Sequence, residues 1–262
     1  MPRSGCGTYL LGLVPNGISA KVHFARYTVD LHSESALKLI AREDARRYTY
    51  NAVVSFLGGI GGLQTQQAAW AVTKLYYSAF YVGRAALCRA DHVIFHAPKP
   101  SGSGHTQYEL LVRVGQKATI VSKSPSTHKL VALRFQEEGY PGFMAGLEVG
   151  GLDPFLWLME QREYWQYRAS RFPDPEMPDI LAQVDVTKAQ RLLEEYASDR
   201  TGVFLSDPTH ALIAIPFRLV MWALSQESLV SPGAATEEDI VYLRKRCQIG
   251  KQTLSGIRRL IE

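Results

Sequence analysis

The chain has 262 residues, of which 46% are hydrophobic and 21% are charged, and its formal net charge is +4. This composition excludes a disordered chain and predicts a substantial core, in one large domain or in one domain with an appended subdomain. The mild positive charge permits a polyanionic partner without requiring one, so any case for nucleic acid depends on where the basic residues gather.

The cysteines and the longest apolar run exclude two further classes. Cys6, Cys88 and Cys247 are far apart and odd in number, which argues against a disulfide framework and against a cysteine zinc site. The longest apolar run, 211–224, is interrupted by a proline and an arginine and is too short to span a bilayer. We therefore expect a cytoplasmic protein with no signal peptide and no membrane span.

The N-terminal segment predicts a β-hairpin. Apolar runs at 9–14 and 18–27 flank Asn16-Gly17, and Asn-Gly between apolar runs is a strong hairpin signal. We therefore expect residues 1–30 to form an N-terminal β-hairpin extension.

Two helical stretches and a glycine-rich segment follow. Apolar spacing predicts a helix that begins near Ser33 or Ser35 and a second helical stretch at 50–57. Four glycines in 58–62 predict a loop that ends this stretch. The segment lacks the Lys-Ser or Lys-Thr pair of a phosphate-binding loop, so we favour an ordinary break over phosphate binding.

Residues 66–90 carry a helical apolar period on more than one face, which predicts a buried central helix. A separate face of this helix either meets a polar partner inside the fold or lines a site. Its members are Lys74, Tyr77, Tyr81, Arg84 and Cys88.

After this helix the pattern favours strands. Residues 92–96 read as an extended piece, and the alternation in 108–114 followed by 117–122 predicts a second hairpin. His92 and His96 have the spacing of a helical ligand pair, but the residues between them favour a strand and no third ligand is near. We expect neither a metal nor a cofactor.

The second half returns to helices. Apolar spacing predicts helices over 128–138 and 186–198, and Asp153-Pro154 opens another, because Asp suits a cap and Pro a first turn. Short apolar runs at 203–205 and 211–215 predict a third hairpin, followed by a helix that starts at Pro216.

The last helix, 236–262, carries a basic strip. Arg244, Lys251 and Arg258 lie seven residues apart. The strip either tracks nucleic-acid phosphates or complements the helix dipole.

A dense aromatic and basic cluster ends the helix that Asp153 opens. It contains Arg162, Trp165, Tyr167, Arg168 and Arg171. Such a cluster suits base stacking combined with phosphate contact. An aromatic anchor in a protein interface explains it equally well.

Two segments resemble those of HEPN domains. Residues 76–87, YYSAFYVGRAAL, resemble the YYAAFHAARALL helix of that family, and residues 162–167, REYWQY, resemble its RExAxY segment. The resemblance implies an up-down helical bundle over 31–200 that dimerises or joins a protein complex. Overall we expect a mainly α protein, α+β through its added β-hairpins, with the C-terminal hairpin and helices of 201–262 packed on the bundle.

The resemblance also implies a role for particular residues. Active HEPN ribonucleases cut RNA without a metal, using an arginine followed four to six residues later by histidine. Here Arg162 matches the arginine and Tyr167 stands in the place of the histidine, with Arg84 and Tyr81 in support. Arg89 with His96, and Arg26 with His32, have similar spacings that chance alone would produce.

Two functions follow as alternatives. One is an RNA-directed effector of a prokaryotic defence or toxin–antitoxin system, whose ribonuclease activity the tyrosine at 167 calls into question. The other is a non-catalytic HEPN-like module that binds a protein partner or a nucleotide.

Overall fold

The computed structural model describes residues 5–99, 101–121, 126–168, 186–226, 238 and 241–242. Its α-helices are α1 (Gly5–Gly12), α2 (Ala20–Arg26), α3 (Leu31–Gln64), α4 (Ala68–Arg89), α5 (Thr127–Glu137), α6 (Pro154–Glu163), α8 (Val186–Ser198), α9 (Val203–Ser206) and α10 (Pro208–Ser225). A 3-10 turn, η1 (Gly142–Met144), and a π-helical turn, η2 (Tyr164–Arg168), lie before and after α6. The strands are β1 (His92–Pro98), β2 (His105–Leu111) and β3 (Thr119–Ile120). The chain is therefore mainly α with a small sheet, as the sequence predicts.

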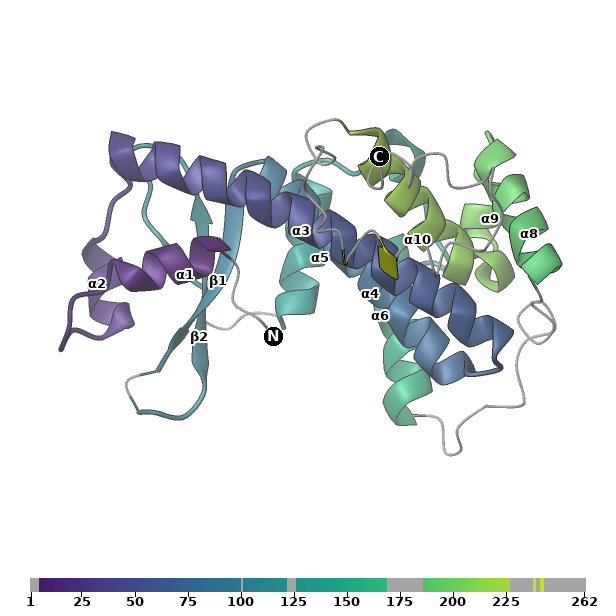
Figure 1. The fold of residues 1–262 in the computed structure, drawn as a ribbon, viewed down its shortest axis with the longest axis horizontal. Coiled ribbons are helices and arrows are strands. Elements are labelled where there is room, and N and C mark those ends of the chain that lie inside the picture. Colours follow the sequence, from purple (N-terminus) through teal and green to yellow (C-terminus); the bar gives the residue numbers. More distant parts are fainter. Residues whose placement is uncertain are drawn as a thin grey trace.

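Helix α3 runs across the whole molecule and connects two packed regions (Figure 1). Its first half lies over α1, α2 and the β1–β2 hairpin, and its second half packs on α4 among the remaining helices. Asp30 starts α3 by accepting a hydrogen bond from the Ser33 backbone at 2.7 Å.

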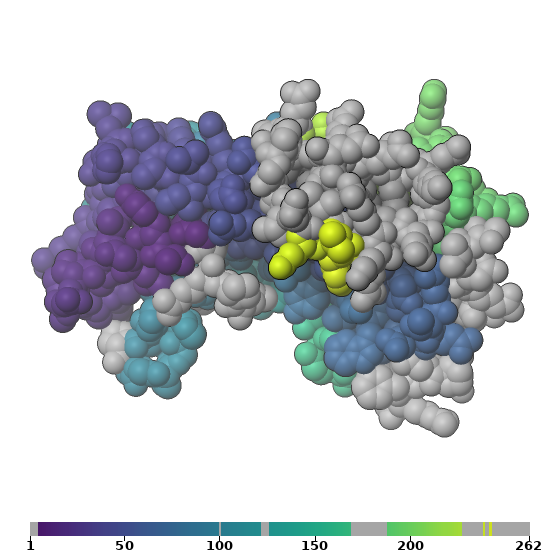
Figure 2. Space-filling model, viewed as in Figure 1, coloured from purple at the N-terminus to yellow at the C-terminus, as the bar shows by residue number. Residues whose placement is uncertain are grey.

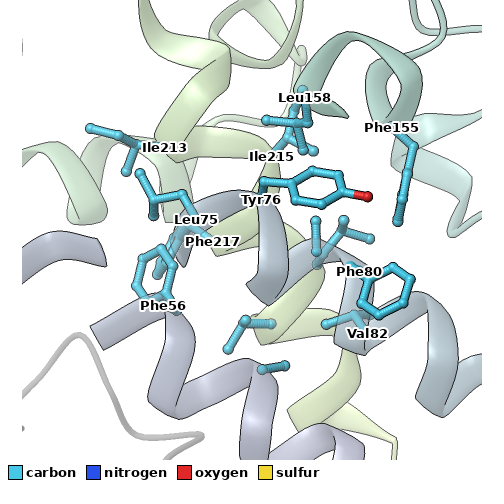
Figure 3. Close-up of a cluster of buried hydrophobic side chains, with 14 of the residues drawn as sticks. Phe56, Leu75, Tyr76, Phe80, Val82, Phe155, Leu158, Ile213, Ile215 and Phe217 are labelled. Carbon is cyan, nitrogen blue, oxygen red and sulfur yellow. The ribbon is translucent and has the colours of Figure 1, made fainter. Parts of the chain in front are cut away.

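The larger core lies around α4. Figure 3 shows Tyr76 of α4 among side chains of α6 and α10, with Phe56 of α3 nearby. Tyr76 is completely buried and the α4 helix buries residues on most of its faces. The prediction of a buried central helix is confirmed.

The smaller core is formed by α1, α2, the first half of α3 and one face of the sheet. Val93 and Phe95 of β1 point into it, whereas Ile94 belongs to the larger core. Strand β1 is thus buried on both faces and separates the two cores.

The N-terminal hairpin prediction is wrong, because residues 5–26 form two helices joined by a turn. The buried Asp44 carboxylate accepts hydrogen bonds from the Gly5 and Cys6 backbone N–H groups at 2.7 and 2.9 Å, which fixes the start of α1. Ser19 caps α2. Gly17 still makes a turn, with φ of 81°, but the turn connects helices.

The second hairpin prediction is confirmed. Strand β2 pairs antiparallel with β1, with Phe95 opposite Tyr108, and with β3, with Tyr108 opposite Ile120. The sheet order is β1-β2-β3.

The predicted break at the glycine-rich segment is also wrong, because α3 continues through it to Gln64. A Cβ atom on Gly59 would lie 2.7 Å from Cγ of Leu75, and one on Gly62 would lie 3.2 Å from Cβ of Ala71. The glycines therefore serve as the surface on which α4 approaches α3 closely.

The third hairpin is absent from the described residues, because 203–206 and 208–225 form the helices α9 and α10. Asp207 caps α10 by accepting a hydrogen bond from the Thr209 backbone at 2.9 Å, and Pro208 occupies the first turn. Pro216 lies inside the helix rather than at its start. The predicted helices at 128–138, after Asp153 and at 186–198 are confirmed as α5, α6 and α8.

The predicted helix over 236–262 lies outside the described residues except for 238, 241 and 242, which are helical. Among the described helices none is long and apolar enough to cross a membrane.

The glycine contact gives a first prediction. Gly59→Ala should lower the free energy of unfolding by about 1–2 kcal/mol, because overpacking against the buried Leu75 exceeds the gain of about 1 kcal/mol in helix propensity. Gly12→Ala is the control, since a Cβ there meets nothing within 4 Å. Urea denaturation of both variants checks this. Equal or raised stability of Gly59→Ala would contradict the close-packing role of the glycine.

Candidate functional site

A cluster of aromatic and basic side chains forms where α4, the start of α5 and the end of α6 meet. We call it the arginine–tyrosine cluster; its members are Tyr76, Tyr77, Tyr81, His128, Arg162, Gln166 and Tyr167. The first turn of α5 lies between the β1–β2 hairpin and α6 (Figure 1). The outline of the molecule is indented between that hairpin and the region of α4 and α6 (Figure 2).

Arg162 has an aromatic environment without an acid. Its guanidinium carbon lies 5.6 Å from the ring centre of Tyr76 and 5.8 Å from those of Tyr77 and Tyr167. Its Nε donates a hydrogen bond to Oε1 of Gln166 at 3.1 Å. No carboxylate among the described residues forms an ion pair with it. The charge of Arg162 is therefore held in place by rings and an amide, and no acid of the described residues neutralises it.

The acid next to Arg162 in the chain has a different partner. Glu163 lies 3.6 Å from the Arg168 guanidinium, in a pair that is largely exposed. Arg168 thus faces an acid on its own segment.

Helix α6 is held at its N-terminal end, and Arg162 lies in its last turn. Oδ1 of Asp153 accepts hydrogen bonds from the Phe155 and Leu156 backbones and from the Tyr140 hydroxyl. The ring of Phe155 packs edge-on against Tyr76, with centroids 6.2 Å apart. After Glu163 the backbone widens into the π turn η2, a form often found at functional sites.

His128 joins the cluster from α5. Its Nδ1 lies 2.7 Å from the Tyr76 hydroxyl, and its ring centre is 4.5 Å from that of Phe80. Burial, followed by the positive charges of Arg162 and Arg84, lowers the pKa of His128 to about 4. Burial raises the pKa of the Tyr76 phenol, so that the phenol stays protonated at neutral pH.

Of the two residues expected to support the site, Tyr81 belongs to the cluster and Arg84 lies next to it in the core. Arg84 is buried, donating to the Tyr48 hydroxyl at 2.6 Å and to the Ile94 carbonyl at 3.1 Å. The Tyr48 ring stacks on that of Tyr81, which in turn lies 6.0 Å from Tyr77. Arg84 therefore connects α3, α4 and β1, and the Tyr48 ring links it to Tyr81 of the cluster.

The structure divides the predicted RNA-binding aromatics into two kinds. Tyr167, which we expected beside Arg162, is there and is 73% exposed, so its outer ring face is open to a ligand. Trp165 is a correction: it is only 9% exposed and belongs to the larger core, so its ring has no free face for a base. Tyr164, 53% exposed, is the accessible aromatic ring next to it.

The remaining predicted RNA contacts lie outside the described residues. They are Arg171, Arg244, Lys251 and Arg258.

The other arginine–histidine spacings do not form sites in the described chain. Arg89 donates to the Gln226 side chain at 2.7 Å, while His96 lies 3.1 Å from the Thr127 hydroxyl. Arg26 and His32 are both exposed, in α2 and α3. No group of three His, Cys, Asp or Glu side chains among the described residues is arranged to hold a metal ion.

Sequence reasoning missed His128 and placed Tyr76 in the apolar stripe. A fully buried tyrosine needs a partner for its hydroxyl, and this need was the available signal. The partner lies 52 residues away, and nothing in the residue pattern singles out His128 among seven histidines.

Comparisons with protein-family models, with curated proteins and with solved structures found no match to this chain. The HEPN resemblance therefore depends on the two segments that carry it, 76–87 and 162–167.

The lowered pKa of His128 gives a second prediction. Between about pH 4 and its ordinary value of 6.5, the unfolded chain binds a proton that the folded imidazole refuses. Stability should therefore fall as the pH drops through this window, and His128 should contribute nothing to the slope above it. Denaturant unfolding at a series of pH values should show a shallower dependence for His128→Gln than for the wild type. Parallel curves would mean that His128 titrates normally.

Proposed function

We propose that this protein binds single-stranded RNA at the arginine–tyrosine cluster, with Arg162 contacting a phosphate and the accessible tyrosine rings stacking on bases. The observation that carries the proposal is the guanidinium of Arg162, which lies beside three tyrosine rings and forms no ion pair with an acid in the part of the chain that the structure describes. A guanidinium can hold a phosphate through two parallel hydrogen bonds, and an aromatic face accepts any base.

The physical setting supports a ligand rather than a structural ion pair. Two other arginines of the described chain use a terminal nitrogen on a protein oxygen: Arg134 forms a bidentate bond with Glu109 at 2.9 Å, and Arg218 donates to two backbone carbonyls. Arg162 donates only to an amide oxygen, through Nε, within the described residues. Its two terminal nitrogens are the ones that a phosphate would take.

The arrangement favours binding over cleavage. His128 and Tyr76 are the paired groups that would exchange a proton, and their pKa values move in opposite directions away from neutrality. Neither group changes its protonation state readily near pH 7. The HEPN resemblance sets this RNA binding in a prokaryotic defence or toxin–antitoxin system, as an RNA-directed effector or as a module that assembles with one.

The test is an affinity measurement on purified protein. Arg162→Ala should weaken binding of a fluorescent single-stranded RNA tenfold or more, because a hydrogen-bonded charge pair contributes roughly 1.5–3 kcal/mol. Arg191→Ala is the matched control, since Arg191 is an exposed helical arginine whose Nε is bonded to Glu195 on α8. Fluorescence anisotropy gives both affinities, and thermal melting reports whether Arg162→Ala stays folded.

Equal affinities for the two arginine variants would overturn the proposal. The same RNA incubated with the wild type in chelator reports cleavage, and cutting that Arg162→Ala abolishes would make the protein a metal-independent ribonuclease.

A protein-assembly role is the other outcome of this experiment. If the wild type binds no RNA but light scattering shows an oligomer that Tyr167→Asp converts to monomer, the exposed tyrosines of η2 serve an interface instead.

A further inference from the structure

His128 and Arg162 flank the same pair of tyrosine rings from different helices. The His128 ring centre lies 5.6 Å from that of Tyr76 and 5.7 Å from that of Tyr77. The guanidinium carbon of Arg162 lies 5.6 and 5.8 Å from the same two ring centres. An imidazole from α5 and a guanidinium from α6 thus pack near the same two tyrosine rings of α4, of which Tyr76 is buried and Tyr77 is partly exposed.

The hydrogen bond to Tyr76 assigns the protons of the imidazole. Tyr76 is completely buried, and within the described chain its hydroxyl has His128 Nδ1 as its one hydrogen-bond partner, at 2.7 Å. A buried hydroxyl needs an acceptor for its proton, so the phenol donates and Nδ1 accepts. The single proton of the neutral imidazole is then on Nε2.

Nε2 of His128 is the imidazole nitrogen that Tyr76 leaves available as a donor. Within the described residues no acceptor bonds to it, and the His128 side chain is only partly buried. The two terminal nitrogens of Arg162 are likewise without a carboxylate in that part of the chain. Two sets of N–H donors, one neutral and one cationic, are therefore left over beside the same tyrosines.

We propose that His128 is a phosphate-binding residue, which donates its Nε2–H as a neutral imidazole so that His128 and Arg162 together hold one phosphodiester group. The inference rests on the proposed RNA binding and names the residue that completes its phosphate subsite. Tyr76 is a positioning residue: it fixes the tautomer and orientation of the ring and does not touch the ligand. Tyr77, between the two donors, forms the floor of the subsite.

This role differs from proton transfer in a way that experiment can separate. A histidine that serves as a base must present a bare nitrogen to its substrate. With Nδ1 occupied by the phenol and Nε2 protonated, His128 presents only a donor. Its contribution is to binding.

The first measurement compares two histidines that have the same kind of partner. His128→Ala should weaken single-stranded RNA binding about tenfold, because a hydrogen bond to a charged phosphate is lost. His210→Ala is the matched control, since Nδ1 of His210 bonds the buried Tyr196 at 3.0 Å, in α10 and α8. His128→Gln keeps an N–H donor and should retain more affinity than His128→Ala.

The second measurement needs no RNA. Nitrogen-15 NMR of the imidazoles in the intact protein should show His128 protonated on Nε2 and not on Nδ1. Addition of inorganic phosphate should shift the Nε2 resonance of His128 in the wild type and leave His210 unmoved. Tyr76→Phe removes the bond that fixes the tautomer and should shift the His128 resonances before phosphate is added.

The outcomes separate the two proposals. If the wild type binds RNA but His128→Ala binds equally well and phosphate leaves His128 unmoved, the subsite inference is overturned and the proposed function stands. If the wild type binds no RNA, the proposed function fails, and the phosphate titration alone decides whether the subsite exists. A proton found on Nδ1 would overturn the inference in either case.

Discussion

The close contact between α3 and α4 is the constraint on which the rest of the structure depends. Gly59 and Gly62 allow Leu75 and Ala71 to lie almost against the α3 backbone, so this face of α4 is completely closed. Other faces of α4 are covered by α5, α6 and α10. One strip remains partly open, and it carries Tyr77 and Tyr81. The arginine–tyrosine cluster lies on this strip because the α3–α4 contact assigns the other sides of α4 to the core.

Arg162 differs from two arginines that hold the fold together, Arg84 and Arg134, in the groups that surround its guanidinium. Buried Arg84 bonds a phenol and a carbonyl and connects α3, α4 and β1. Arg134 joins β2 to α5 through the two oxygens of Glu109. The charge of Arg134 is neutralised by a carboxylate, and Arg84 is buried, with its guanidinium bonded to two neutral oxygens. Arg162 has rings and one amide oxygen around it, which orient the guanidinium, and no acid of the described residues neutralises it. A ligand would bind Arg162 at a smaller entropic cost, because the side chain is already ordered before the ligand arrives.

The sequence predicted the fold best where a local signal and the global packing agreed. Asp153-Pro154 and the periodic stretches 128–138 and 186–198 became helices because the Asp153 cap and the helical spacing of apolar residues are signals within each segment, and the core buries the same apolar residues. Asn16-Gly17 was misinterpreted because a turn signal does not say whether it joins strands or helices. The glycines of 58–62 were misinterpreted because glycine permits close packing between two helices as well as a break in one helix. Only contacts with distant residues decide between these meanings. The buried Asp44 holds the start of the helix α1, and Leu75 packs on Gly59.

The candidate site was predictable only in its contiguous part. Arg162 and Tyr167 lie on one short segment, five residues apart, so their contact requires no distant part of the chain. The partner of Tyr76 comes from a helix that the chain reaches only after the β-hairpin, and nothing in the sequence near Tyr76 indicates such a pairing.

The position from which the histidine reaches the cluster bears on function. A histidine at position 167 would have both ring nitrogens free, so that it could serve as base or acid. The ring of His128 instead has one nitrogen bonded to the buried phenol of Tyr76 before any ligand arrives. If the phosphate subsite is as proposed, burying one nitrogen of the imidazole converts a group capable of acid–base chemistry into a fixed donor, and the cluster recognises RNA without a proton-transfer group.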